Sequence, residues 1–274
     1  MKNLTSGNNR NIISKWLYTL GRVLLFCVFC VIILAFCSSL TKHIPFKFTD
    51  HLSILLATIL TFLLILLFLK WEKLKLSEVG VIPGKYSISR FLCGCIVGFC
   101  MAISQALIVL MHGHFQLKVV PEISFIDIFS PLLLYLFIAC REELAFRSYS
   151  LRSLNISLSP ILALAIIGII FIVEHVVGGM TWKMAILGSG AGAILFGVSA
   201  LKTKGLALSL GLHSAWNFGQ WTFGFKNKPG IWEAVVEKGY ETEIENVGLT
   251  AFVFVMAIAI TGICFYYRKN KLSE

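Results

Sequence analysis

The stretch LSILLATILTFLLILLFL, residues 52–69, contains no charged residue. A helix of about 20 apolar residues is long enough to cross the hydrocarbon core of a bilayer. The stretch lacks the alternation of apolar and polar residues that a strand of a membrane barrel would show. We therefore predict that it is a transmembrane helix.

Comparable apolar segments lie on both sides of this stretch. Together with it, the predicted spans are roughly Trp16–Leu40, Leu52–Leu69, Phe91–Met111, Ile128–Arg152, Pro160–Gly178, Trp182–Leu201, Gly205–Phe223 and Val247–Tyr267. No internal repeat and no linker rich in Pro, Gly or Ser divides the chain. The sequence thus predicts an all-α polytopic membrane protein of about eight transmembrane helices, with a single domain over residues 1–274.

The overall composition excludes several classes of protein. The chain is 57% hydrophobic and 14% charged, with a mean hydropathy of +0.84, whereas a soluble domain carries roughly 25% charged residues. A water-soluble enzyme, a disordered tail and a nucleic-acid binder are therefore excluded. The net charge of +10 is explained by Lys and Arg flanking the spans, and the expected surroundings are a lipid bilayer without nucleic acid.

The distribution of Lys and Arg predicts the orientation of the chain. With a cytoplasmic N-terminus, 16 of them fall in inside segments, Arg141, Arg147 and Arg152 included, and 7 fall outside. An excess of positive charge marks the cytoplasmic side. Both termini are predicted to be cytoplasmic and the loop Lys226–Asn246 to be outside, while Arg22 in the first span is expected to snorkel to the interface.

Ionisable residues at membrane depth are costly and usually face a cavity or a partner. Three spans contain such residues, in the patterns Glu142-Glu143-x-x-x-Arg147, Phe171-x-x-x-His175 and His213-x-x-x-Asn217. The fourth and fifth spans can form a helical hairpin that turns near Leu158–Ser159. In that hairpin Glu142 faces His175 at the same depth, while the last pattern lies near mid-membrane on the seventh span.

These residue types suit the hydrolysis of a peptide bond. Glu142 can take a proton from water, and His175 can position the same water. His213 and Asn217 can donate hydrogen bonds to a developing oxyanion. Glu143 paired with Arg147 is expected to support the site, since a buried guanidinium needs a carboxylate. The catalytic core is predicted over about residues 128–223.

The same side chains leave a metal mechanism open. Glu142, His175 and His213 could bind zinc and leave a fourth position for water. We favour a site with no metal and no other cofactor, because His213 and Asn217 already supply electrophilic help.

The three motifs resemble those of the CPBP intramembrane protease family, also called the CAAX protease and bacteriocin-processing family. The family includes type II CAAX prenyl endopeptidases and bacterial Abi-type proteins. The resemblance covers about residues 130–220. It implies that Glu142 is the water-activating acid with His175 as its partner, that His213 and Asn217 form the oxyanion site, and that Glu143 and Arg147 support it.

The expected activity is that of an endopeptidase, glutamate-dependent or metallo, that cuts a membrane-associated protein or peptide in a bacterial plasma membrane. The alternative is a non-catalytic membrane scaffold or bacteriocin immunity protein. A transporter with Glu142 and His175 as a proton relay is a third interpretation, against which the chain shows no inverted repeat.

Overall fold

The structure is a computed structural model that describes residues 4–44, 48–226 and 228–269. Its α-helices are α1 (Leu4–Thr41), α2 (Thr49–Glu72), α3 (Ser87–His112), α4 (Phe125–Glu142), α5 (Leu151–Ser157), α6 (Pro160–Val177), α7 (Trp182–Met184), α8 (Gly190–Thr203), α9 (Ala207–Thr222) and α10 (Glu241–Lys269). Two segments are π-helical, η1 (Glu143–Ser150) and η2 (Ala185–Ser189). Two strands complete the described part of the chain, β1 (Phe115–Val119) and β2 (Trp232–Val236).

Consecutive helical segments join into longer helices, because α4 continues through η1 into α5 and α7 continues through η2 into α8. Counted in this way, the described residues form eight helices, and each overlaps one predicted span. Six of them are long and apolar enough to cross a membrane by length and composition. The other two are α4–η1–α5 and the 16-residue α9, which carry two of the three polar motifs. The all-α, multi-pass membrane fold is confirmed.

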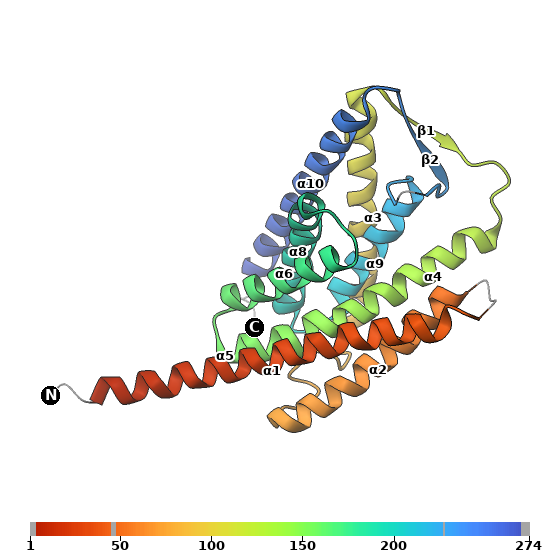
Figure 1. Cartoon of the computed structure of the whole chain (residues 1–274). Coiled ribbons are helices and arrows are strands. Elements are labelled where there is room, and N and C mark those ends of the chain that lie inside the picture. The colour runs from red at the N-terminus through yellow and green to blue at the C-terminus, as the bar shows by residue number, and fades with distance from the viewer. Residues whose placement is uncertain (1–3, 45–47, 227, 270–274) are drawn as a thin grey trace.

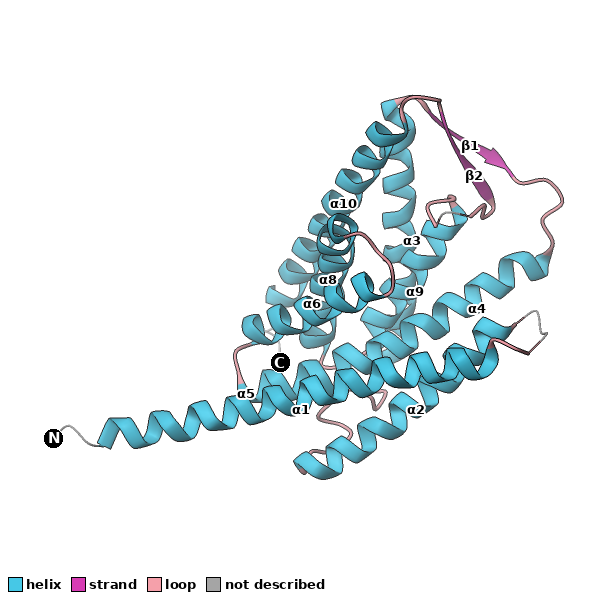
Figure 2. Ribbon diagram, in the orientation of Figure 1, coloured by secondary structure: helices cyan, strands magenta, loops and turns pink. Residues whose placement is uncertain are grey.

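The helices form two groups that meet where α4 packs on α9. In the first group α1 packs on α2, and α2 packs on α4; in the second, α3 and α8 pack on α9, and α10 packs on both α3 and α8. Figure 1 shows the first group running across the lower part of the view and the second rising from it at an angle. Figure 2 shows that the strands are confined to one end of the second group.

Glycines allow α3 and α9 to approach each other closely. A Cβ added to Gly94 would lie 2.5 Å from the carbonyl oxygen of Leu208, and one added to Gly98 would lie 2.5 Å from that of Leu212. Small residues four positions apart permit such backbone contact between membrane helices. This contact fixes the position of α9, which carries the last of the three motifs.

The two strands form a small sheet that the sequence did not predict. β1 and β2 pair antiparallel, with Leu117 opposite Ala234 at the centre of the ladder. The paired residues are more than 100 positions apart in the chain. A sequence signal for a local turn therefore cannot predict the pairing. The pairing brings the loop after α3 and the loop after α9, both predicted outside, to the same end of the molecule.

The expectation for Arg22 is wrong. Its guanidinium forms an ion pair with Glu72 of α2, at 2.9 Å, instead of snorkelling to the interface. Glu72 also accepts hydrogen bonds at 2.8 Å from the hydroxyls of Tyr149 and Ser153. A carboxylate partner within reach makes a charge at this position less costly than it would be in lipid.

Three arginines counted in the inside segments are not loop residues. Arg141 and Arg147 are 3% and 0% exposed, and Arg152, which donates a hydrogen bond to the carbonyl of Ala200, is 8% exposed. All three lie in α4–η1–α5 and contact groups on other helices. They therefore do not indicate on which side of the membrane their segment lies. Of the other charges in the topology argument, Lys2, Lys47 and Lys271 lie outside the described residues.

Candidate active site

The first motif lies where the helix of the fourth span changes its winding. Glu142 is the last residue of α4, and Glu143 begins the π-helical η1, which contains a non-helical backbone at Ser148 (φ −84°, ψ −105°). π-Helical turns inside α-helices are rare overall. Where they do occur, they often lie at functional sites. The sequence predicted a regular helix here, and the wider turn is a feature that it missed.

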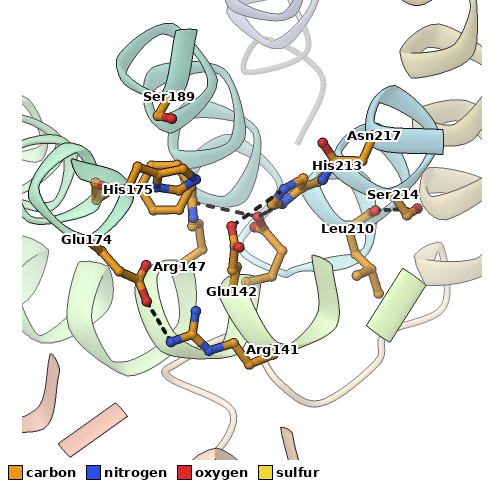
Figure 3. A network of polar contacts seen from close by, with 12 residues as sticks. Arg141, Glu142, Arg147, Glu174, His175, Ser189, Leu210, His213, Ser214 and Asn217 are labelled. Atoms are coloured by element: carbon orange, nitrogen blue, oxygen red, sulfur yellow. Dashed lines mark hydrogen bonds and ion pairs between the residues drawn. The ribbon is translucent and has the colours of Figure 1, made fainter. Parts of the chain in front are cut away.

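His213 of α9 contacts both glutamates of this motif. Its Nδ1 lies 3.0 Å from Glu143 Oε1, within hydrogen-bond distance, and its Nε2 lies 3.6 Å from Glu142 Oε2. The imidazole also stacks on the ring of Phe196 in α8, with centroids 4.3 Å apart and planes 12° apart. These contacts hold the ring of His213 in one orientation against two consecutive carboxylates, and Figure 3 shows it beside Glu142.

Arg147 lies behind the two glutamates in an aromatic cage. Its side chain is fully buried, and its Nε lies 3.7 Å from Glu143 Oε1. The centroids of the Phe171, Phe196 and Phe146 rings lie 4.4, 5.5 and 5.7 Å from its guanidinium carbon. Cation–π attraction of this kind strengthens when the cation is removed from water. The phenylalanine of the second motif thus contacts Arg147 from α6.

His175 lies at the carboxyl end of α6. Its Nδ1 lies 2.9 Å from the carbonyl oxygen of Phe171. A carbonyl only accepts, so Nδ1 carries the proton and Nε2 of the neutral ring is left as an acceptor. Figure 3 shows His175 and His213 on opposite sides of Glu142.

The hairpin of the fourth and fifth spans is present, but its ion pair is one residue away from the predicted one. Arg141 of α4 and Glu174 of α6 form an ion pair at 2.6 Å. Within the described residues, no hydrogen bond or ion pair joins Glu142 directly to His175. The two are electrostatic neighbours, and Glu142 is also influenced by the charges of Arg141 and Arg147.

Asn217 follows His213 by one turn of α9. Its Oδ1 accepts a hydrogen bond at 3.0 Å from Nζ of Lys226, which lies in the loop after the helix. Sequence reasoning counted Lys226 only as an outside charge. The one signal that could have indicated its position is Gly224, because a glycine directly after a helix is typical of a chain reversal.

The degree of burial divides the motif residues into two sets. Glu142, His175 and Asn217 are each partly exposed, whereas Glu143, Arg147 and His213 are buried. The first set can therefore contact water or a substrate. The second set lies behind it, although Nε2 of His213 still faces Glu142.

The predicted zinc ligands show one feature of a metal site and lack another. Each of the two histidines has its Nδ1 held by an oxygen, which is how metal-binding histidines are usually oriented. However, no group of three His, Cys, Asp or Glu side chains in the described part of the chain lies close enough together to hold a metal ion. The side chains as arranged do not form a zinc site, so we derive no step through a metal.

Residues 124–219 match the family described as Type II CAAX prenyl endopeptidase Rce1-like. The matched segment begins at Ser124, the capping residue of α4, and includes all three motifs and most of α9. No curated protein matches the chain.

Proposed function

We propose that the chain is a CAAX-type intramembrane protease of the CPBP family, as its match over residues 124–219 indicates, and that it hydrolyses a peptide bond by a glutamate-dependent, metal-free route. The observation that carries the proposal is that Glu142 lies 3.6 Å from Nε2 of His213 and is an electrostatic neighbour of His175. A partly exposed carboxylate, two oriented imidazoles and an amide come from three different helices. This combination can activate water and stabilise an oxyanion.

In the first step Glu142 acts as general base. Its Oε2 is buried and makes no hydrogen bond within the described residues, so a water molecule that enters the site would find an unused acceptor there. Nε2 of His175 accepts the second hydrogen bond of that water and orients it. The water oxygen attacks the scissile carbonyl carbon while its proton passes to Glu142. General-base catalysis of this kind contributes about 10²–10⁴-fold to the rate.

The tetrahedral intermediate carries a negative oxygen that needs donors. Asn217 offers the N–H groups of its amide. His213 already donates from Nδ1 to Glu143, so it can donate from Nε2 only as an imidazolium. The carbon–nitrogen bond then breaks, and the leaving amine takes the proton from Glu142. The products are a carboxylate and an amine.

The proposed substrate is a membrane-associated protein or peptide. The matching family description names CAAX prenyl endopeptidases, so a lipidated peptide that ends in Cys-aliphatic-aliphatic-X is the first substrate to test. We also propose that the protein lies in a bacterial plasma membrane with both termini in the cytoplasm. A role as a non-catalytic scaffold or immunity factor is the competing proposal.

The test uses the purified full chain in phospholipid vesicles with an internally quenched peptide that ends in a farnesylated C-a-a-X sequence. We expect the wild type to cleave it and Glu142→Gln to lose cleavage at an unchanged protein level. The matched variant Glu78→Gln changes an exposed glutamate in the loop after α2 and should cleave normally. Equal rates for wild type and Glu142→Gln would contradict the proposed mechanism and favour the scaffold.

A further inference from the structure

The chain reverses direction directly after α9. The amide of Phe225 donates to the carbonyl of Gln220 at 2.8 Å, and the amide of Gly224 donates to that of Trp221 at 2.9 Å. Gly224 has a left-handed φ of +73°. This pair of bonds around a left-handed glycine is the Schellman motif, which ends a helix and turns the chain back along it. The turn brings Lys226 beside Asn217, nine residues earlier.

The small sheet holds this turn in place. The Phe223 ring stacks on Trp232 of β2, with centroids 5.2 Å apart, and Phe225 stacks on Phe115 of β1 at 5.8 Å. A Cβ at Gly224 would lie 2.8 Å from the backbone nitrogen of Ala234. Both strands thus contact the turn closely, and the position of Lys226 is set by the sheet and by α9 together.

The hydrogen bond from Lys226 determines which way the amide of Asn217 points. An ammonium group has three donors and no acceptor. The Asn217 atom 3.0 Å from Nζ must therefore be the carbonyl oxygen. The NH₂ group, on the opposite branch of the planar amide, is left to donate elsewhere. A hydrogen bond from a charged donor is also roughly twice as strong as one between neutral groups.

The surroundings of Nζ link it to the rest of the site. The ring of Tyr135 in α4 has its centroid 5.8 Å from Nζ. Desolvation lowers the pKa of Lys226 from its ordinary value, and the negative charge of Glu142 acts in the opposite direction. The side chain as a whole is exposed, and its amine lies against Asn217 and the Tyr135 ring.

We propose that Lys226 is a positioning residue that holds the amide of Asn217 with its N–H groups directed at the oxyanion. Its positive charge draws electron density toward the amide oxygen and makes those N–H groups better donors. The inference rests on the proposed function and adds a residue that lies outside the three motifs and after the matched segment. It also explains why a two-stranded sheet accompanies a membrane helical bundle: the sheet holds the lysine in place.

The test measures kcat and KM of the full chain in vesicles with the farnesylated C-a-a-X peptide. Lys226→Met removes the donor and the charge at similar length, and Lys226→Arg keeps both. Lys228→Met is the matched control, because Lys228 is an exposed lysine of the same loop. Asn217→Ala, alone and combined with Lys226→Met, completes a double-mutant cycle.

We expect Lys226→Met to lower kcat by about 10- to 100-fold with little change in KM, below the roughly 10²–10³-fold loss for a whole oxyanion donor. Lys226→Arg should recover most of the rate, and Lys228→Met should match the wild type. In the Asn217→Ala background, Lys226→Met should change kcat less than about 2-fold, because a residue that acts through Asn217 has no further effect once the amide is absent.

Three results would overturn the inference. A normal kcat for Lys226→Met would do so and leave the proposed function intact. A rise in KM alone would make Lys226 a substrate-binding residue, for example for a terminal carboxylate. Additive losses in the double variant would separate Lys226 from Asn217. If wild type and Glu142→Gln do not differ, the proposed function fails and this inference fails with it.

Discussion

Two partly buried glutamates in this protein lie in polar clusters of opposite character. Glu72 of α2 has both oxygens engaged, by Arg22 at 2.9 Å and by the hydroxyls of Tyr149 and Ser153 at 2.8 Å. Glu142 has only a 3.6 Å contact from His213 to one oxygen, and that oxygen makes no hydrogen bond within the described residues. The first carboxylate is satisfied by protein, whereas the second is free to bind something else.

Both clusters are built on the same continuous helix, α4–η1–α5. Tyr149 and Ser153 of this helix contact Glu72, while Glu142, Glu143 and Arg147 contact His213 and the aromatic cage. A buried polar group without a partner costs about 1–3 kcal/mol, and more when it is charged. The contrast therefore assigns the Glu72 cluster to stability and, under the proposed function, the Glu142 cluster to chemistry.

The largest effect is expected when each of the two carboxylates, Glu142 and Glu72, is replaced by an amide. Glu142→Gln should reduce kcat by about 10²–10⁴-fold, the usual contribution of a general base, and leave the melting temperature close to that of the wild type. Glu72→Gln should lower the melting temperature and leave kcat close to that of the wild type, because it removes the negative charge that pairs with Arg22. Both variants are purified in the same detergent, and thermal unfolding and peptide cleavage are measured on each.

If Glu72→Gln abolished cleavage per folded molecule while Glu142→Gln only lowered the melting temperature, the two clusters would have the opposite roles. Asp50→Asn in the first turn of α2 controls for the loss of a negative charge from the same helix and should change neither quantity.

The next effect concerns the support behind the site. Arg147→Met should lower stability by about 3–5 kcal/mol, the usual cost of removing one partner of a buried ion pair, because Glu143 is then left with only His213. The double variant Arg147→Met/Glu143→Gln removes both charges and should recover part of this loss. Denaturant unfolding in detergent measures both values, and a double variant no more stable than the single one would show that the cage and not the charge pair holds Arg147.

A smaller effect is expected in the satisfied cluster. Tyr149→Phe deletes the hydroxyl that donates to Glu72 and leaves the packed ring against Phe26 and Phe68. Hydrogen bonds to charged groups contribute roughly 1.5–3 kcal/mol, so stability should fall by about that amount while kcat stays within about 2-fold of wild type. A large loss of kcat at normal stability would show that the Glu72 cluster also contributes to catalysis.

The sequence predicted the helices and the motif residues but not how those residues are connected. Apolar run length located all eight helices, of which six are long and apolar enough to cross a membrane. The i,i+4 spacing of Glu143 and Arg147 predicted their ion pair, which is present at 3.7 Å. The π-helical turn was missed because tertiary contacts, not local propensity, decide where an α-helix widens. Lys226 was missed because its position depends on strand pairing between residues more than 100 apart.

The errors about arginine have a common cause. Arg22 was assigned to the interface, and Arg141, Arg147 and Arg152 to inside segments, because a charge in an apolar sequence is expected to seek water. Each instead has a partner inside the bundle: Glu72, Glu174, the aromatic cage with Glu143, and the carbonyl of Ala200. Apart from Glu143 and Phe146, which lie on the same helix as Arg147, these partners are on other helices, and hydropathy along one segment cannot reveal them.

The smallest expected effect, no change at all, tests the absence of a metal. The Nε2 atoms of His175 and His213 and the carboxylate of Glu142 are the donors that zinc would use, with Zn–N distances of about 2.0–2.1 Å. We expect a strong chelator followed by dialysis to leave cleavage of the farnesylated peptide unchanged, and the purified chain to contain no stoichiometric metal by elemental analysis.

Asn217→Ala is the companion variant, because an amide is a good hydrogen-bond donor and a poor zinc ligand. A metal-free site should lose about 10²–10³-fold in kcat without that donor. Loss of activity on chelation, its return with added Zn²⁺ at one ion per chain and near-normal cleavage by Asn217→Ala would together replace the glutamate route with a zinc mechanism, and Glu142 would then be a metal ligand rather than an unpaired base.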